Sequence, residues 1–164
     1  MHDSERGVEK GRCSAQSPMA IFDLYGFFHG TWRFERKIHD SASKDIRETE
    51  GGVTFTPDGD VPGARLLYRE SAEHDGPEAH SVLPRDLVFN FPTMTKGEVR
   101  FADGTLFHVL DLGKGIVRVQ YENGNEIYHG LYRALEFGYW LSVWRIEGAR
   151  SNQIITTHYR RLDG

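Results

Sequence analysis

From Thr31 to the end of the chain, apolar and polar residues alternate with a period of two, and turn residues interrupt the alternation at short intervals. Such alternation is typical of antiparallel strands that bury one face. Asp103-Gly104 and Asn123-Gly124 each supply the positive-φ residues that a type I′ hairpin needs. About ten strands are predicted, at residues 31–39, 47–56, 64–72, 85–91, 97–102, 105–112, 116–122, 126–135, 138–147 and 153–161. Because no helical segment follows Thr31 to make a parallel crossover, an up-and-down meander is expected.

The length of the chain and the order of these segments predict one all-β domain, a closed antiparallel up-and-down β-barrel of about 8–10 strands. Ser17-Pro18 is typical of a helix start, and apolar residues at helical spacing follow it, so a short helix is predicted over 18–28. This helix is expected to cap one end of the barrel. The polar residues 1–17 predict a disordered leader, so the barrel domain is expected to span 18–164.

Two features of the sequence concern what covers the barrel. Residues 73–84 contain Gly and Pro clusters and predict a long loop that lies over the open end as a lid. Several C-terminal strands are apolar on both faces, most clearly between Tyr139 and Ile146. A sheet that is apolar on both faces needs cover on both. We therefore expect either the helix or the partner subunit of a homodimer to lie outside these strands.

Composition and charge exclude several classes of partner. The 20 basic and 24 acidic residues give a net charge of -4, which argues against nucleic acid. No apolar run is long enough for a membrane span or for the core of a secretory signal. The one cysteine, Cys13, excludes an intramolecular disulfide and fits a reducing compartment, so a cytoplasmic location is expected. No phosphate-binding loop, nucleophile elbow, dinucleotide fingerprint or zinc spacing occurs, so neither a cofactor nor a metal is predicted.

A set of motifs follows in order along residues 20–163, beginning with Gly30-x-Trp32 after the apolar helix. The others are Leu66-Leu67-Tyr68-Arg69-Glu70, Phe107-His108-x-Leu110-Asp111, Tyr128-x-Gly130-x-Tyr132, Trp144-Arg145-x-x-Gly148 and Thr157-x-Tyr159-x-Arg161. This ordered set resembles a lipocalin-like, calycin-type family that is catalogued as a domain of unknown function. The resemblance implies a closed antiparallel barrel with an internal cavity, and it implies no activity. The chain departs from secreted lipocalins in lacking a secretory signal and disulfides, which puts extracellular transport in doubt.

A second resemblance concerns the end of the chain. His158-x-x-Arg161-Leu162 is similar to the end of haem-binding ten-stranded barrels of the nitrobindin type, in which a late His ligates iron. Those proteins carry a longer glycine-rich extension after the first Trp, whereas Trp32 is followed here by Arg33-Phe34-Glu35. Haem binding is therefore a minor alternative.

Polar side chains in the middle of predicted strands must face either a cavity or solvent, which makes them the candidate site residues. The candidate ligand-binding residues are Tyr68, Glu70, His108, His129, Tyr132, Trp144, Arg145 and His158. Convergence of the three histidines inside the barrel would give hydrogen-bonding groups, a proton-transfer pair or a three-His metal site. In the alternative interpretation, one or two of them face outward and the rest pair with a Tyr or a backbone carbonyl.

Other candidates carry two interpretations each. Glu70 shares one face of its strand with Tyr68, and it either acts as an acid or base in the cavity or forms a cross-strand salt bridge with an Arg, which is favoured. Trp144 and Arg145 must point to opposite faces, with Trp144 expected to form a flat wall of the cavity. Asp111 is open in the same way as Glu70: it either acts as an acid or base, or it merely holds His108 or an Arg.

Two small motifs predict packing. Trp32 is expected to plug the closed end of the barrel, with Arg160 or Arg161 stacked over it as a cation–π pair. Gly130 lies between Tyr128 and Tyr132 on one face, and its missing side chain leaves room either for a ligand or for close packing of the helix.

The function that these features favour is intracellular binding of a small apolar or amphipathic ligand in an internal cavity. The first alternative is an acid–base enzyme of the isomerase, cyclase or hydratase type that uses the cavity His, Tyr and Glu residues, although no catalytic residue is assigned. A dimerisation module is the other alternative, and it rests on the doubly apolar C-terminal strands.

Overall fold

The computed structural model describes residues 16–72, 83–148 and 152–162. The predicted leader over residues 1–17 lies outside this range except for Gln16 and Ser17, which are exposed. The predicted lid over 73–84 lies outside it except for Leu83 and Pro84. The described part of the chain contains no helix with the length and apolar character needed to span a bilayer.

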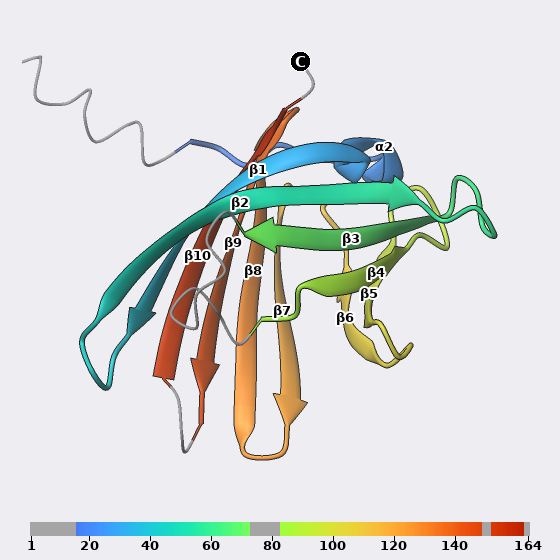
Figure 1. Cartoon of the computed structure of the whole chain (residues 1–164). Coiled ribbons are helices and arrows are strands. Elements are labelled where there is room, and N and C mark those ends of the chain that lie inside the picture. Colours follow the sequence, from blue (N-terminus) through green and yellow to red (C-terminus); the bar gives the residue numbers. More distant parts are fainter. Residues whose placement is uncertain (1–15, 73–82, 149–151, 163–164) are drawn as a thin grey trace, which may run out of the picture.

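Ten strands form one antiparallel sheet with the order β6-β5-β4-β3-β2-β1-β10-β9-β8-β7 (Figure 1). The elements are α2 (Leu24–Phe28), β1 (Gly30–Asp40), β2 (Ile46–Pro57), β3 (Arg65–Ala72), β4 (Asp86–Asn90), β5 (Gly97–Phe101), β6 (Leu106–Leu110), β7 (Ile116–Asn123), β8 (Glu126–Glu136), β9 (Tyr139–Glu147) and β10 (Asn152–Arg161). The predicted strands are therefore confirmed, each to within two residues at either end. The all-β, up-and-down architecture is confirmed as well.

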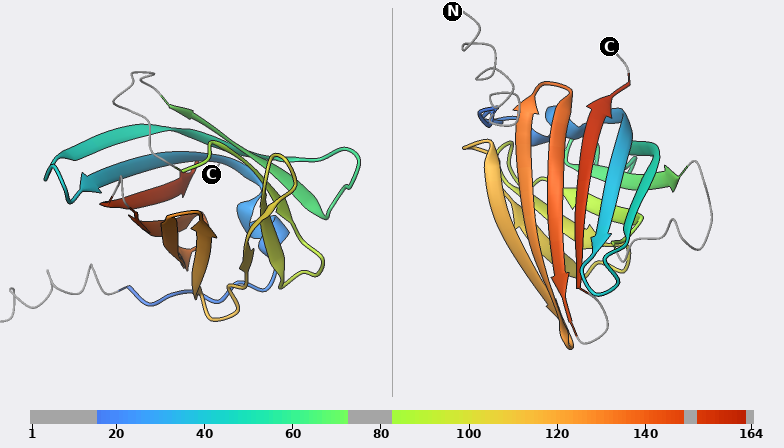
Figure 2. Two further views of the ribbon diagram at one scale, coloured as in Figure 1. Left: turned by 90° about the horizontal axis from the view of Figure 1, so that it is seen from below. Right: turned by 90° about the vertical axis from the view of Figure 1, so that its left-hand side faces the viewer.

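The barrel is nearly closed. Figure 2 shows that the sheet curls round until strands from its two ends approach each other. Every neighbouring pair in the strand order is joined by a hydrogen-bonded ladder, whereas β6 and β7 contact each other without one in the described residues. We call this junction the seam, defined by β6 and β7. Side chains rather than backbone hydrogen bonds therefore close the barrel there.

The predicted helix over 18–28 is wrong in extent. Helix α2 covers only Leu24–Phe28, and its N-cap is Asp23, whose Oδ1 accepts a hydrogen bond from the Gly26 amide at 3.1 Å. The preceding residues are not helical, and the amides of Met19 and Ile21 donate instead to the barrel carbonyls of Ala134 and Leu112 at 2.7 and 2.8 Å. The helical spacing of apolar residues therefore indicated a buried segment, but only the last part of that segment is helical. As expected, α2 lies across one end of the barrel (Figure 1).

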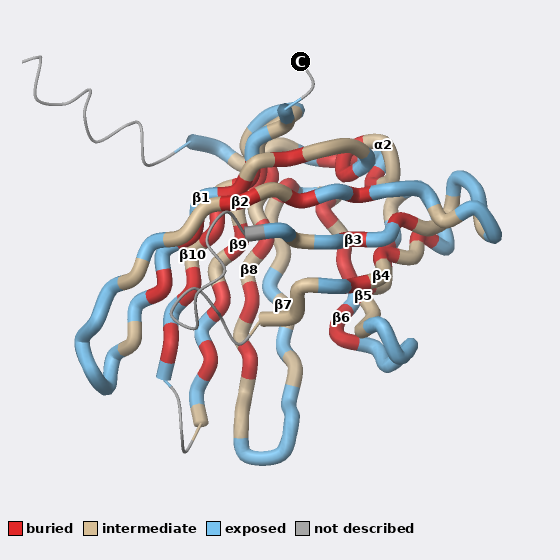
Figure 3. The backbone as a smooth tube through the Cα atoms, viewed as in Figure 1, coloured by how far each residue is buried: buried red, intermediate tan, exposed pale blue. Residues whose placement is uncertain are grey.

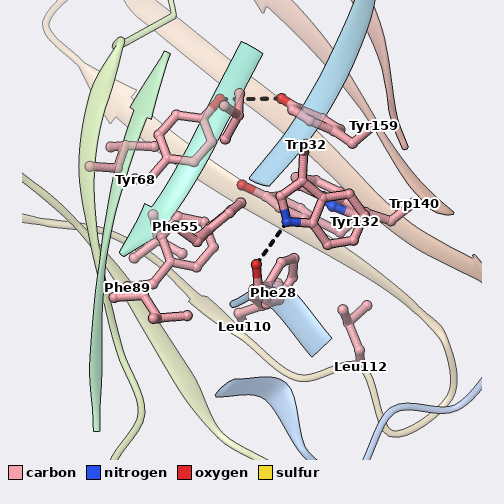
Figure 4. Close-up of a cluster of buried hydrophobic side chains, with 14 of the residues drawn as sticks. Phe28, Trp32, Phe55, Tyr68, Phe89, Leu110, Leu112, Tyr132, Trp140 and Tyr159 are labelled. Atoms are coloured by element: carbon pink, nitrogen blue, oxygen red, sulfur yellow. Dashed lines mark hydrogen bonds between the residues drawn. The ribbon is translucent and has the colours of Figure 1, made fainter. Parts of the chain in front are cut away.

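The core lies inside the curled sheet, and buried residues alternate with half-buried or exposed ones along most strands (Figure 3). Trp32 is fully buried, and its Nε1 donates to the Phe28 carbonyl at 2.8 Å, a bond drawn in Figure 4. The Arg161 guanidinium lies 4.4 Å above the Trp32 ring, whereas Arg160 covers Tyr139 at 3.9 Å. The predicted plug with a late-strand arginine is therefore confirmed, and the arginine is Arg161.

The outer face of the C-terminal strands is not covered by the helix. Tyr139, Leu141 and Val143 lie on the outside of β9 and are half-buried, while α2 lies at the end of the barrel. The expectation that the helix covers this face is wrong. A homodimer that would cover it stays a prediction.

Candidate functional site

The barrel encloses a small cavity whose walls are mainly aromatic. Its volume is about 20 Å³, which is room for about one water molecule. Tyr68 comes from β3, Tyr132 from β8, Trp140 from β9 and Tyr159 from β10 (Figure 4). Trp140 is stacked between Tyr159 and Tyr132, with ring centroids 3.8 and 5.6 Å away, so this wall is rigid.

A buried ion pair forms the polar side of this cavity. Arg36 donates from Nη1 and Nη2 to the two carboxylate oxygens of Glu70 at 2.9 and 2.8 Å, and from Nε to Thr157 at 2.9 Å. The two side chains are only 4% and 6% exposed. Burial lowers the pKa of Arg36, but the hydrogen bonds to Glu70 and the negative charge of its carboxylate raise that pKa more, so Arg36 stays charged. The favoured interpretation of Glu70 as the partner of an arginine is therefore confirmed.

Tyr68 extends the ion pair into a network. Its hydroxyl donates to Glu70 and lies 3.4 Å from the hydroxyl of Tyr159. Burial raises the pKa of Tyr68, and the negative charge of Glu70 raises it further, so the phenol keeps its proton. As predicted, Tyr68 and Glu70 share the inner face of β3. Both Glu70 oxygens are occupied, which leaves this carboxylate little capacity to act as a base.

His108 lies on the inner face and is only 4% exposed. Its Nδ1 is 3.0 Å from the carbonyl of Val109, which can only accept, so Nδ1 carries the proton. Its Nε2 therefore accepts from the hydroxyl of Tyr132 at 3.1 Å. Burial lowers the pKa of His108 to about 4, so the ring is neutral at pH 7. A histidine paired with a Tyr and a backbone carbonyl was one of the two sequence-based interpretations, and His108 fits it.

The neutral state of His108 predicts a loss of stability in acid. Folding lowers its pKa from 6.5 to about 4, so as the pH falls the unfolded chain binds the proton first. The stabilisation is complete above about pH 6.5 and is lost progressively down to about pH 4, by roughly 3 kcal/mol in total. Urea unfolding at a series of pH values between 7.5 and 4 measures this fall in the free energy of unfolding. The variant His108→Gln, which keeps a donor and an acceptor, should lose less stability over the same range, and an equal loss in both proteins would show that His108 is not the group responsible.

The other two histidines and Arg145 lie on the outer face. His129 and Arg145 both approach Glu147, at 3.7 and 3.2 Å. His158 contacts the hydroxyl of Tyr139 at 2.8 Å, and its pKa is lowered by partial burial and by the charge of Arg160. The hypothesis that the three histidines converge is therefore wrong, and the described residues contain no group of His, Cys, Asp and Glu able to hold a metal ion. Because His158 lies on the outer face of β10, it cannot ligate a haem held inside the barrel.

Two further sequence-based expectations are corrected. Asp111 forms an ion pair with Lys96 at 2.6 Å and holds neither His108 nor an arginine. The space at Gly130 is filled by Trp144, whose Cη2 would lie 2.6 Å from a Cβ at this position. Gly130 and Trp144 are directly opposite on β8 and β9, so the missing side chain admits a neighbouring ring rather than a ligand or the helix.

Trp144 faces inward and Arg145 is exposed, as their adjacent positions require. The Trp144 ring stacks on Phe107 with centroids 5.0 Å apart and an angle of 11° between the planes. Phe107 in turn lies at the border between the cavity and the outside, because it lines both the cavity and a larger groove.

That groove lies at the seam and has a volume of about 510 Å³. We call it the seam groove, defined by the aromatic residues Phe101, Phe107, Tyr121 and Tyr128 together with Pro84, Ala102, Asp103, Thr105 and Asn123. The ring centroid of Phe101 is 4.7 Å from that of Phe107 and 5.2 Å from that of Tyr121. Tyr121 and Tyr128 are cross-strand neighbours, with ring centroids 5.9 Å apart. The four rings form a continuous aromatic surface beside the cavity.

Sequence reasoning missed the seam groove. The sequence did contain a signal for these aromatic residues, because each of the two predicted type I′ turns has one shortly before it and one shortly after it. Phe101 and Phe107 flank Asp103-Gly104, and Tyr121 and Tyr128 flank Asn123-Gly124. Joining the two aromatic pairs requires knowing that β6 and β7 lie at opposite ends of the strand order and meet when the sheet curls. No spacing along the chain contains that information.

The fold and the cavity together define a lipocalin-like, calycin-type barrel. The chain belongs to the family described as "Family of unknown function (DUF6314)", whose model matches residues 28–161. No curated protein matches the chain in sequence.

Two solved structures have the same fold at low sequence identity. One is an S-type phycobiliprotein lyase from Guillardia theta, 11% identical with a TM-score of 0.61, and the match covers 86% of this chain and 92% of the lyase. The other is a protein of unknown function from the DUF3598 family of Nostoc punctiforme, 10% identical with a TM-score of 0.62. That match covers 88% of this chain but only 51% of the other, so the chain spans about half of that protein. At these identities the likeness concerns the fold alone.

Proposed function

We propose that the protein binds a small, largely apolar molecule with one polar end, and that the binding site is the seam groove. The observation that carries this proposal is a groove of about 510 Å³ with four aromatic residues, next to a rigid internal cavity. Ligand sites of proteins have volumes of roughly 300–1,000 Å³ and mainly apolar walls with a few polar groups. Asp103, Thr105 and Asn123 supply polar groups at the rim. The internal cavity, at about 20 Å³, takes no more than a water-sized group.

The predicted site residues take different places in this proposal. Trp144 supports Phe107 from behind, and the buried networks of Tyr68 with Glu70 and of His108 with Tyr132 hold the barrel interior rigid beneath it. His129, Arg145 and His158 lie on the outer face, so we assign them no contact with this ligand.

The acid–base alternative receives less support from the same geometry. The Glu70 oxygens are held by Arg36 and Tyr68, and both ring nitrogens of His108 have partners. A cytoplasmic location, a single domain over 18–164 and a homodimer stay proposals from the sequence.

The test is a direct binding measurement with a neutral solvatochromic naphthalene dye such as Prodan. The dye emission should shift to the blue on binding, and Trp144 fluorescence should change because Trp144 stacks on Phe107 in the groove wall. The half-buried Tyr121 contacts Phe101, Phe107 and Tyr128, so Tyr121→Ala should weaken binding roughly 10-fold. The control is Phe22→Ala, since Phe22 is 65% exposed and precedes the helix that caps the barrel. Equal affinities of the two variants would contradict the site, and no binding by the wild-type protein would contradict the function.

A further inference from the structure

In the described part of the chain, the seam groove is lined by charge of one sign. Its rim carries the carboxylate of Asp103, and the described residues that line it include no Lys, Arg or His. The Asp103 Oδ1 accepts a hydrogen bond from the Thr105 amide at 2.9 Å, and this bond lowers the pKa of Asp103, so the group is ionised at pH 7. An anionic ligand would meet this carboxylate at the rim of the groove.

Aromatic rings attract cations because the face of each ring carries partial negative charge. This chain uses that attraction within the fold, where Arg161 covers Trp32 at 4.4 Å and Arg160 covers Tyr139 at 3.9 Å. At the seam groove, four rings are gathered into one surface beside a carboxylate, but the lining includes no cationic side chain in the described part of the chain. The groove therefore has the chemistry of a cation site without a cation from the protein.

Geometry within the aromatic cluster supports the same conclusion. The rings of Phe107 and Tyr121 are perpendicular, at 89°, and those of Phe107 and Tyr128 are nearly so, at 84°. Rings at right angles bring the edge of one ring to the face of another, so the cluster presents ring edges and ring faces in more than one direction. A net charge of -4 adds a long-range attraction for cations.

We propose that the ligand of the seam groove is an organic cation, an alkylated ammonium attached to an apolar body, whose charged group lies over the aromatic surface beside Asp103. This inference rests on the proposed function, because it names the ligand class of the same groove. The aromatic rings and the apolar body supply affinity through burial, and the carboxylate with the ring faces selects the sign of the charge.

The experiment compares three naphthalene probes of similar size: Prodan, which is neutral, a 2-naphthyl-trimethylammonium salt and 2-naphthalenesulfonate. Affinities are measured by Trp fluorescence and by NMR shifts of the indole N–H groups at low ionic strength. The cation should bind about 10-fold or more tightly than the anion, and the difference should shrink in high salt. If Prodan binds but the cation binds no better than the anion, the inference is overturned and the proposed function stands. If none of the three binds, both are overturned.

Two substitutions assign the effect to a residue. Asp103→Asn keeps the acceptor for the Thr105 amide and removes the charge, so affinity for the cation should fall about 2- to 5-fold with Prodan unchanged. Asp40→Asn is the matched control, because Asp40 accepts the Ala42 amide in the β1–β2 turn at 3.0 Å in the same manner. Asp40→Asn should leave the affinity for all probes unchanged. An equal loss of affinity for Prodan and the cation in Asp103→Asn, or the same loss in Asp40→Asn, would overturn the inference.

Discussion

Glu70→Gln is expected to lower the free energy of unfolding by about 3–5 kcal/mol, because it leaves the charge of Arg36 buried without its partner. The two Arg36–Glu70 hydrogen bonds measure 2.9 and 2.8 Å, and solvent reaches almost none of either side chain. Tyr68 would also lose a charged acceptor for its hydroxyl. Equilibrium unfolding in urea, followed by circular dichroism, measures the loss.

A surface ion pair in the same sheet is the control. Arg33 and Glu50 lie 2.9 Å apart, but their side chains are 41% and 45% exposed. Glu50→Gln should therefore cost about 1 kcal/mol or less. Similar losses for Glu50→Gln and Glu70→Gln would show that burial does not set the strength of the inner pair.

Removing both charges should restore much of the stability. In Arg36→Met/Glu70→Leu neither charge is buried, and replacement of a buried ion pair by apolar residues is often neutral or stabilising. The double variant is expected to unfold at a higher urea concentration than Glu70→Gln. It should also bind Prodan as the wild-type protein does, since neither residue lines the seam groove. A double variant no more stable than Glu70→Gln would show that the pair contributes something other than charge balance.

The strands were predictable because one inner face per strand imposes a period of two on the sequence. The same parity placed Trp144 and Arg145 on opposite faces. The same alternation predicts that His129 points outward, because its two neighbours in β8, Tyr128 and Gly130, face the core. His158 likewise precedes the inward-facing Tyr159. The signal that excludes these two histidines from the interior was therefore in the sequence.

His108 was harder to place. A register shift between Val99 and Arg100 makes the pairing of β5 with β6 irregular, and the consecutive residues Phe107 and His108 are both buried. A bulge of this kind breaks the alternation, so parity does not give the orientation of either side chain. The seam groove depends on the orientation of Phe107, because the Phe107 ring contacts both Trp144 and Tyr121.

Trp32→Ala is expected to destabilise the barrel by about 3–5 kcal/mol, as large-to-small substitutions of buried aromatic residues do. Trp32 is fully buried, and its ring contacts Phe27 and Trp140 with centroids 6.1 and 6.3 Å away. The substitution also removes the hydrogen bond that joins β1 to the last residue of α2. Urea unfolding followed by circular dichroism measures the loss. Trp32→Phe keeps most of the volume and should cost less than half as much.

A double-mutant cycle separates packing from the cation–π contact. Arg161 covers the Trp32 ring at 4.4 Å and also donates to the Phe27 and His29 carbonyls, so Arg161→Met alone removes several interactions. Combining it with Trp32→Phe measures how much more strongly the indole attracts the guanidinium than a phenyl ring does. The expected coupling energy is about 0.5–1 kcal/mol. Strict additivity would mean that the indole attracts the guanidinium no more than a phenyl ring does, so that the choice of Trp at this position serves packing and the hydrogen bond to Phe28.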